Sequence, residues 1–176
     1  FALALELLKN PLLDRLLESV GLDLQPFAVC DVRRGVGISL PAAREACRTL
    51  AEAVASSLRA DATVAIAGGE CTVVAGAIAG AVAVEPDLTL VYFDAHGDFN
   101  TLATTPSHFV GGMCLAHVCG RRIGALLWPG ARGIADDHVV LVGARALDPG
   151  EVSNLARSRV LRVPFDPEPA AAPGLL

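Results

Sequence analysis

The sequence predicts an α/β sandwich around a mostly parallel sheet. Short runs rich in β-branched and aromatic residues alternate along the chain with longer segments whose apolar residues recur at helical spacing. The chain has 176 residues, of which 53% are hydrophobic, and this is enough to bury one sizeable core. Because alternating strands and helices are typical of parallel sheets, we expect ligands to bind beyond the carboxyl ends of the strands.

The first predicted elements are a helix and a strand. Residues Pro41 to Arg59 begin with proline and carry apolar residues at helical spacing, which predicts an amphipathic helix. The run Ala62 to Ala67 is then expected to form a buried strand that ends at a glycine turn, Gly68-Gly69.

A second helix is expected over about Thr72–Val84, where Gly76 and Gly80 would let it lie close to the sheet. The stretch from Ala62 to Val84 carries one charge, Glu70, so a membrane-spanning helix is the alternative. The glycine pair interrupts this stretch, and no Lys or Arg follows it closely, which favours the strand, turn and helix.

The second half of the chain continues the alternation. Residues Leu88 to Phe93 predict a buried parallel strand, with Asp94 at its carboxyl end. The remaining expected elements are a helix near 113–122, a strand at 138–142, a helix starting at 148–151 and a strand around 160–163. We expect residues 1–163 to form one domain, although an incomplete one, and residues 164–176 to form a loop or tail.

Charge and cysteine content exclude some classes of protein. The net charge is −5 and no run of Lys or Arg is long, which argues against a nucleic-acid-binding surface. The five cysteines are scattered without the spacing of a zinc finger or a disulfide framework. We therefore expect reduced thiols and a cytoplasmic protein. The Gly68-Gly69-Glu70-Cys71 turn lacks the three-glycine dinucleotide fingerprint, so that alternative is disfavoured.

The candidate chemistry lies in Asp94, His96 and Asp98. Alternate residues of an extended stretch share one face, so these three side chains can converge at the end of the strand. Two carboxylates and an imidazole favour Mn²⁺, with Zn²⁺, Fe²⁺ and Co²⁺ as other candidates. The alternative is that these residues only solvate and cap a turn.

Four motifs occur in the order typical of one enzyme family. They are Gly68-Gly69-Glu70-Cys71, the segment Asp94-Ala95-His96-Gly97-Asp98-Phe99-Asn100, Gly111-Gly112-Met113, and the segment 143–151 (GARALDPGE). This series resembles the arginase/agmatinase/formimidoylglutamase (ureohydrolase) family over roughly residues 40–163. The resemblance implies a three-layer α/β/α fold, a binuclear manganese centre and hydrolysis of a guanidino or formimino C–N bond. It also implies a small guanidino or formimino substrate and a homo-oligomer, a trimer or hexamer.

The resemblance implies roles for individual residues. Asp94 matches a ligand that bridges two metals, His96 a ligand to one metal and Asp98 a ligand to the other, which also gives Asp98 a catalytic role. Three further positions match substrate contacts of the family: Asn100, Ser107 and Asp148. Without the resemblance, Asn100 and Ser107 read as polar loop residues and Asp148 as the start of a helix.

The sequence departs from the family pattern in three places. Cys71 stands where the family has a metal-binding His, so it is either a ligand or a buried small hydrophobic residue. Gly111 stands where many members have a proton-shuttling His; His108 is a candidate substitute, and the alternative is an ordinary exposed residue. The third family motif, an Asp-x-Asp strand end, is absent, since Leu161-Arg162-Val163 has no carboxylate.

Two functional classes follow from these matches and departures. One is a metal-dependent hydrolase of the ureohydrolase family, or an incomplete piece of it. The other is a catalytically degenerate family member with few metals and a role in binding or assembly. The missing third motif fits a fragment, a deletion before Pro164 or true loss of the centre.

Overall fold

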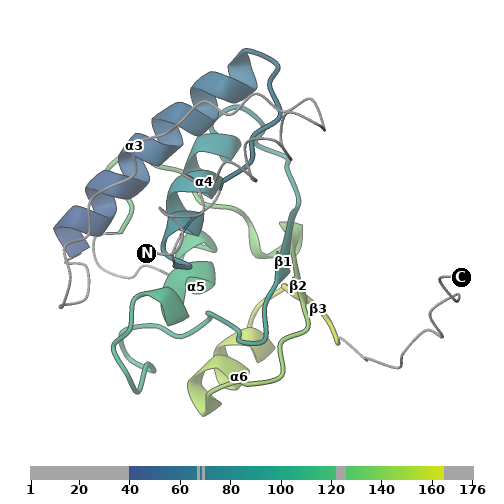
Figure 1. Cartoon of the computed structure of the whole chain (residues 1–176). Coiled ribbons are helices and arrows are strands. Elements are labelled where there is room, and N and C mark those ends of the chain that lie inside the picture. Colours follow the sequence, from purple (N-terminus) through teal and green to yellow (C-terminus); the bar gives the residue numbers. More distant parts are fainter. Residues whose placement is uncertain (1–39, 67, 69, 122–125, 165–176) are drawn as a thin grey trace, which may run out of the picture.

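A computed structural model describes residues 40–66, 68, 70–121 and 126–164 of the chain. Within these residues three strands form a parallel sheet in the order β1-β2-β3 (Figure 1). The strands are β1 Leu90–Phe93, β2 Val139–Val142 and β3 Leu161–Val163. All three were predicted, and their parallel pairing confirms the α/β class.

In the described part of the chain, four α-helices accompany the sheet. They are α3 Leu40–Arg59, α4 Val73–Val82, α5 Cys114–Val118 and α6 Pro149–Ala156. Short 3-10 helices, η1 Gly111–Met113 and η2 Asp136–His138, precede α5 and β2. The helix α5 is shorter than the predicted 113–122, and Gly120 lies just beyond it at a φ of +82°, a left-handed conformation that ends helices.

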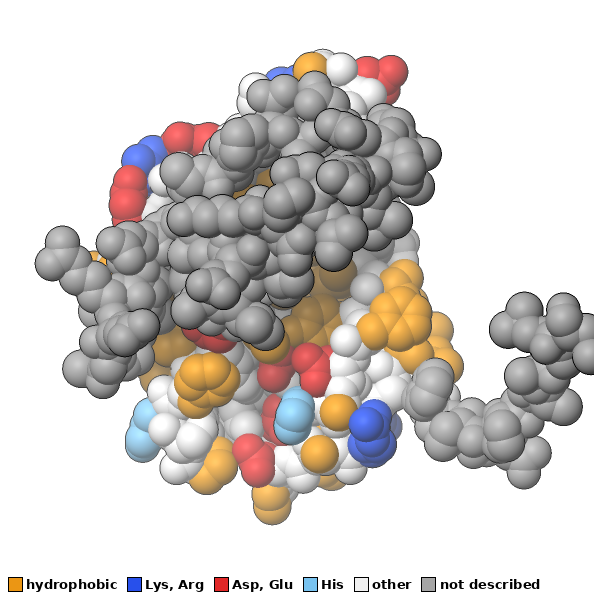
Figure 2. Space-filling view, viewed as in Figure 1, with side chains coloured by type: hydrophobic (Ala, Val, Ile, Leu, Met, Phe, Trp, Pro, Cys, Tyr) orange, Lys and Arg blue, Asp and Glu red, His pale blue; other side chains and the backbone are white. Residues whose placement is uncertain are grey.

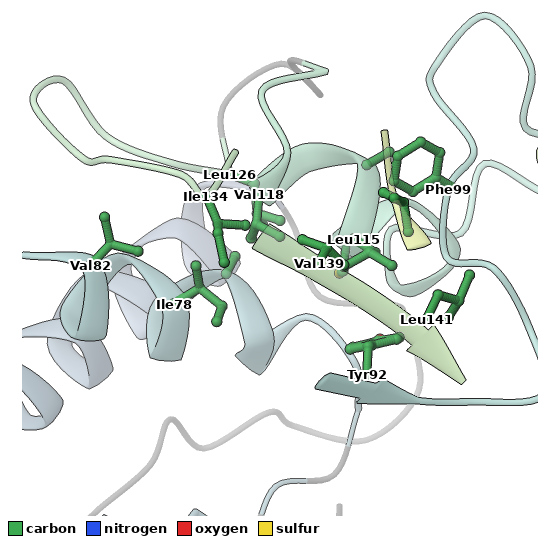
Figure 3. Packing of buried hydrophobic residues seen from close by; sticks show 14 of the residues in the cluster. Ile78, Val82, Tyr92, Phe99, Leu115, Val118, Leu126, Ile134, Val139 and Leu141 are labelled. Carbon is green, nitrogen blue, oxygen red and sulfur yellow. The ribbon is translucent and has the colours of Figure 1, made fainter. Parts of the chain in front are cut away.

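The core lies between the helices and one face of the sheet. Tyr92 of β1 and Val139 and Leu141 of β2 point into it (Figure 3). Facing them are Ile78 and Val82 from α4, together with apolar residues of the other helices: Ala43, Cys47, Leu115, Val118 and Leu155. Both connections between strands step in the same direction across the sheet, so right-handed crossovers place their helices, α5 and α6, on one side.

The opposite face of the sheet is apolar and exposed. Strand register places its side chains in two rows, Val91, Val140 and Leu161, and then Phe93, Val142 and Val163. Phe93 is 74% exposed and Leu161 is 60% exposed. Figure 2 shows hydrophobic side chains at the surface beside the strands. Among the described residues, helices therefore form one of the two outer layers that the resemblance implies.

The prediction of a strand at Ala62–Ala67 is wrong for residues 62–66, which are the part of this run that the structure describes. Residues 62–66 form no regular secondary structure, are mostly exposed and pair with no described strand, so β1 is an edge strand of the described sheet and not a central one. A β-rich composition favours a strand only where a neighbouring strand can supply hydrogen bonds.

The role expected for the glycines of α4 is also corrected. A Cβ on Gly76 would lie 2.6 Å from the carbonyl oxygen of Cys47, and one on Gly80 would lie 2.5 Å from that of Ala51. Both glycines thus allow close packing of α4 on α3, and not on the sheet.

No helix in the described part of the chain is long and apolar enough to cross a membrane. The boundary between a 1–163 domain and a 164–176 tail stays a prediction, because residues 1–39 and 165–176 lie outside the description.

Candidate metal site

The candidate site lies at the carboxyl ends of β1 and β2. The backbone N–H of Asp94 extends the β1–β2 pairing by donating to the carbonyl of Val142, at 3.1 Å. The next residue, Ala95, is held by the loop after β2. The N–H groups of Arg145 and Ala146 both donate to its carbonyl at 2.8 Å. The loop that carries the acidic residues is therefore anchored at its first two positions, first to β2 and then to the loop that follows β2.

Three of the predicted metal ligands come together. One ligand atom each from Cys71, Asp94 and Asp98 lies within 4.8 Å of the others. Cys71 belongs to the turn before α4, whereas the carboxylates follow β1, so the fold brings together residues 23 positions or more apart. Cys71 and Asp94 are therefore neighbours, as the position of Cys71 in place of the family's metal-binding His leads us to expect. Acidic side chains and a histidine lie close together on the face shown in Figure 2.

The fourth predicted ligand, His96, lies at the edge of this group. Its Nδ1 is 3.2 Å from Oδ1 of Asp94, and its backbone N–H donates to the same oxygen at 2.8 Å. Its side chain is 65% exposed. His96 therefore contacts the carboxylate group from the solvent side.

Asp98 is the most constrained member of the group. It is buried, its φ is +46°, and the hydroxyl of Tyr92 donates to its Oδ2 at 2.6 Å. A non-glycine residue in the left-handed region is strained, and such strain persists where surrounding contacts hold it. Here the N–H of Ala116 in α5 holds the backbone by donating to the carbonyl of Asp98 at 3.0 Å. Burial raises the pKa of Asp98 above its ordinary value, while the hydrogen bonds from Tyr92 and Cys71 lower it in part.

Cys71 is a neutral thiol in this setting. Burial is the largest cause that raises its pKa to about 11, and the negative charge of Asp98 adds to the effect. Thiolate formation at neutral pH therefore requires a cation that compensates the charge, and a metal ion is such a cation.

Two predicted substrate-binding residues lie side by side. The side-chain N–H of Asn100 donates to Oδ2 of Asp148 at 2.9 Å, and the hydroxyl of Thr104 donates to the Asn100 carbonyl oxygen at 3.0 Å. Asn100 is buried and Asp148 is half-buried at the start of α6. The fold thus brings Asp148 from the start of α6 to Asn100, which lies on the loop that also carries the two candidate carboxylate ligands.

Glu151 supports the candidate site by holding two backbone N–H groups. The sequence indicated only that this residue favours the start of a helix. It is buried, its Oε1 accepts a hydrogen bond from the N–H of Phe99 at 3.0 Å, and its Oε2 accepts one from the N–H of Asp148 at 2.9 Å. A Cβ on Gly97 would lie 3.0 Å from Oε1, so the loop approaches Glu151 closely. The Asp-Pro-Gly-Glu capping box was the available signal for the bond to Asp148. No local pattern in the sequence indicated the hydrogen bond between Glu151 and the N–H of Phe99.

The two remaining predicted residues lie in an exposed loop. The N–H of His108 donates to the hydroxyl of Thr105 at 3.0 Å, and the N–H of Phe109 donates to the Ser107 hydroxyl at 3.3 Å. Both Ser107 and His108 are exposed, and these bonds tie them to their own loop. Their substrate-binding and proton-transfer roles stay predictions.

The donor set fits one divalent ion better than the binuclear manganese centre that the resemblance implies. Cys71, Asp94 and Asp98 can share one ion, whereas the described residues would offer a second ion only Asp94 and the exposed His96. The strand β3 adds no carboxylate. Thiolate is also a softer ligand than Mn²⁺ prefers.

Comparison with known proteins places this geometry in a family. A model described as "Arginase family" matches residues 9–166. The N(omega)-hydroxy-L-arginine amidinohydrolase of Streptomyces lavendulae is 33% identical over 129 residues, 72% of this chain and 45% of that protein. The chain thus spans less than half of the length of this curated relative.

Solved structures agree with the family match. The native arginase of Bacillus caldovelox has a TM-score of 0.73 and 29% identity, over 88% of this chain and 55% of that one. The formimidoylglutamase of Bacillus subtilis shares the fold at a TM-score of 0.53 and 17% identity, over 68% of this chain and 35% of that one. Since the family model covers most of the sequence and the fold agrees with it, this chain belongs to the Arginase family.

Proposed function

We propose that this chain carries part of the active centre of a hydrolase that cleaves the C–N bond of a guanidino or formimino substrate. The convergence of Cys71, Asp94 and Asp98 beside the Asn100–Asp148 pair supports the proposal. Curated relatives include arginases and an N(omega)-hydroxy-L-arginine amidinohydrolase, so arginine and its N-hydroxylated form are the first substrates to test. A divalent ion, manganese by analogy with the family, would supply Lewis-acid chemistry and make a bound water more acidic.

The chain's own residues divide the remaining work. Asp148 is half-buried and presents a carboxylate that can pair with a substrate amino group, and Asn100 orients that carboxylate. Asp98 supplies a second acceptor, which the hydroxyl of Tyr92 holds in place. Ser107 and His108 lie in an exposed loop that could contribute a substrate contact and a proton transfer.

The described residues supply too few ligands for two ions. We therefore expect at most about one tightly bound ion per 176-residue chain, with negligible release of urea or formamide. The assay uses arginine, N-hydroxyarginine, agmatine and formimidoylglutamate. Two tightly bound ions together with robust turnover by this chain would contradict the expectation.

A chimera tests the hydrolase directly. Residues 1–163 are joined to the segment of the Bacillus caldovelox arginase that follows the matching strand and restores an Asp-x-Asp strand end. The chimera should bind two ions and release urea, and Asp98→Asn and Asp148→Asn chimeras should lose most of that activity. A chimera that melts cooperatively and binds metal, yet hydrolyses none of the substrates, would overturn the proposal.

A second candidate function is assembly, and the exposed apolar face of the sheet favours it. Unpaired strand edges and exposed apolar rows promote association between chains. Under this reading the chain forms a homo-oligomer without catalysis, and Phe93→Lys should shift it toward monomer in sedimentation equilibrium.

For both candidate functions we place the protein in the cytoplasm, with no nucleic-acid or membrane partner, on the basis of the negative net charge and the scattered cysteines.

A further inference from the structure

We infer that the group Cys71, Asp94 and Asp98 is a thiolate–carboxylate site that selects a thiophilic divalent ion, zinc or cobalt, over manganese. The inference concerns the same site as the proposed function and rests on its being a metal site. It departs from the family in the identity of the ion, because the residues present do not match a manganese donor set.

The first step is geometric. The sulfur of Cys71 and one oxygen each of Asp94 and Asp98 lie within 4.8 Å of one another. Zinc ligands lie about 2.0–2.3 Å from the ion, so atoms around one ion are separated by no more than roughly twice that distance. Small side-chain adjustments therefore suffice for all three residues to bind the same ion.

The second step is the orientation of the ligands. Tyr92 donates to Oδ2 of Asp98 at 2.6 Å, which leaves the other oxygen of that carboxylate for an ion. The N–H of His96 donates to Oδ1 of Asp94 at 2.8 Å and leaves Oδ2 without this bond. Tyr92 thus fixes the rotation of the Asp98 carboxylate, and the N–H of His96 fixes that of the Asp94 carboxylate.

The third step is donor chemistry. Sulfur binds zinc and cobalt readily, whereas manganese prefers carboxylate, carbonyl and water oxygens. With three protein ligands, a zinc ion would retain a fourth position for water or substrate, as catalytic zinc sites do. On binding, the S–H bond of Cys71 breaks, a sulfur–metal bond forms and the proton leaves to solvent.

The test compares metal affinities in the metal-free 176-residue chain and its variants. Most protein sites bind Zn²⁺ more tightly than Mn²⁺, so the informative quantity is the ratio of the two affinities in different variants. Cys71→His restores the family ligand, Cys71→Ser removes the thiolate, and Cys119→Ser is the matched control away from the site. Zinc affinity is measured by competition with a chelator, and free manganese by electron paramagnetic resonance.

We expect the Zn²⁺/Mn²⁺ affinity ratio to fall by roughly tenfold or more in Cys71→His and Cys71→Ser, and to stay unchanged in Cys119→Ser. Bound Co²⁺ should show a thiolate-to-cobalt charge-transfer band in the wild-type chain and in Cys119→Ser, but not in Cys71→Ser. Bound cobalt without that band in the wild-type chain would overturn the inference, and so would an unchanged ratio.

The outcomes separate this inference from the proposed function. A thiolate band together with an inactive, folded chimera would contradict hydrolysis and leave the thiophilic site standing. Activity with manganese but no thiolate band would contradict the site and leave hydrolysis standing. The cobalt spectrum of the wild-type chain decides the inference even where a Cys71 variant fails to fold.

Discussion

The hydroxyl of Tyr92 donates a hydrogen bond of 2.6 Å to Oδ2 of Asp98, from the buried face of β1 to the loop that follows the strand. Tyr92 is itself buried, and burial together with Asp98 raises the pKa of its hydroxyl far above the ordinary value. The hydroxyl therefore stays protonated and serves as a permanent donor. This bond ties a core residue to a candidate metal ligand.

Replacing Tyr92 with Phe tests this bond. Because residues that orient metal ligands typically contribute 10–100-fold to affinity, we expect Tyr92→Phe to weaken metal binding by about tenfold. Calorimetric titration with Zn²⁺ and Co²⁺ measures the change. In an Asp98→Asn background the same substitution should have little further effect, and an equal loss in both backgrounds would assign Tyr92 to core packing alone.

The Cys71→His substitution should raise the affinity for Mn²⁺, because imidazole suits borderline and hard divalent ions better than thiolate does. Manganese titration and thermal melting are measured together. Unchanged Mn²⁺ affinity combined with a lower melting temperature would show that Cys71 only fills space beside the turn.

Glu151 should stabilise the fold through its two backbone partners. Its buried carboxylate accepts hydrogen bonds from the N–H groups of Phe99 and Asp148. Glu151→Gln removes the charge and leaves one amide N–H facing a donor, so we expect a loss of about 1–3 kcal/mol in the free energy of unfolding. The exposed Glu85 provides the control, since Glu85→Gln should leave stability unchanged within about 0.5 kcal/mol. Equal stability of the two variants would refute the role.

The close packing of α4 on α3 should not tolerate a side chain at Gly76. An added Cβ would lie 2.6 Å from the carbonyl oxygen and 2.8 Å from the Cα of Cys47, both backbone atoms that cannot rotate away. We expect Gly76→Ala to lower the free energy of unfolding by about 1–3 kcal/mol in denaturant titrations. At Gly112 an added Cβ meets no atom within 4 Å, so Gly112→Ala is the control and should have a small effect.

The Arg121–Asp136 pair should make stability depend on pH in the acid range. The Arg121 guanidinium donates to both carboxylate oxygens of Asp136, at 3.1 and 2.7 Å, and also lies over the ring of Phe99. The hydrogen bonds from Arg121 lower the pKa of Asp136 below its ordinary value of 3.8.

Because this pKa is lower in the folded chain than in the unfolded chain, the contribution is present above the ordinary value and is lost as the pH falls through the folded value. We expect Asp136→Asn to cost about 0.5–1.5 kcal/mol at pH 7 and less near pH 2, as followed by urea unfolding at both values. A cost that does not change with pH would contradict the charge-based account.

Several features were predictable from local patterns in the sequence. The run before Asp94 predicts a strand, the proline and apolar spacing after Leu40 predict α3, and the Asp-Pro-Gly-Glu segment predicts the start of α6. Each of these signals lies within one element. The ligands after β1 were predictable for the same reason, since they follow the end of one strand.

Other features depend on contacts between distant segments. The β-rich run 62–66 pairs with no described strand, Gly76 packs on α3 and not on the sheet, and Glu151 reaches the N–H of Phe99 from 52 positions away. No local pattern specifies such partners, because they follow from how the elements pack. The sequence by itself thus determined where the acidic residues and most elements lie. The tertiary structure decided that Cys71 meets Asp94 and Asp98, because the turn before α4 and the end of β1 come together only when both elements pack into the same core.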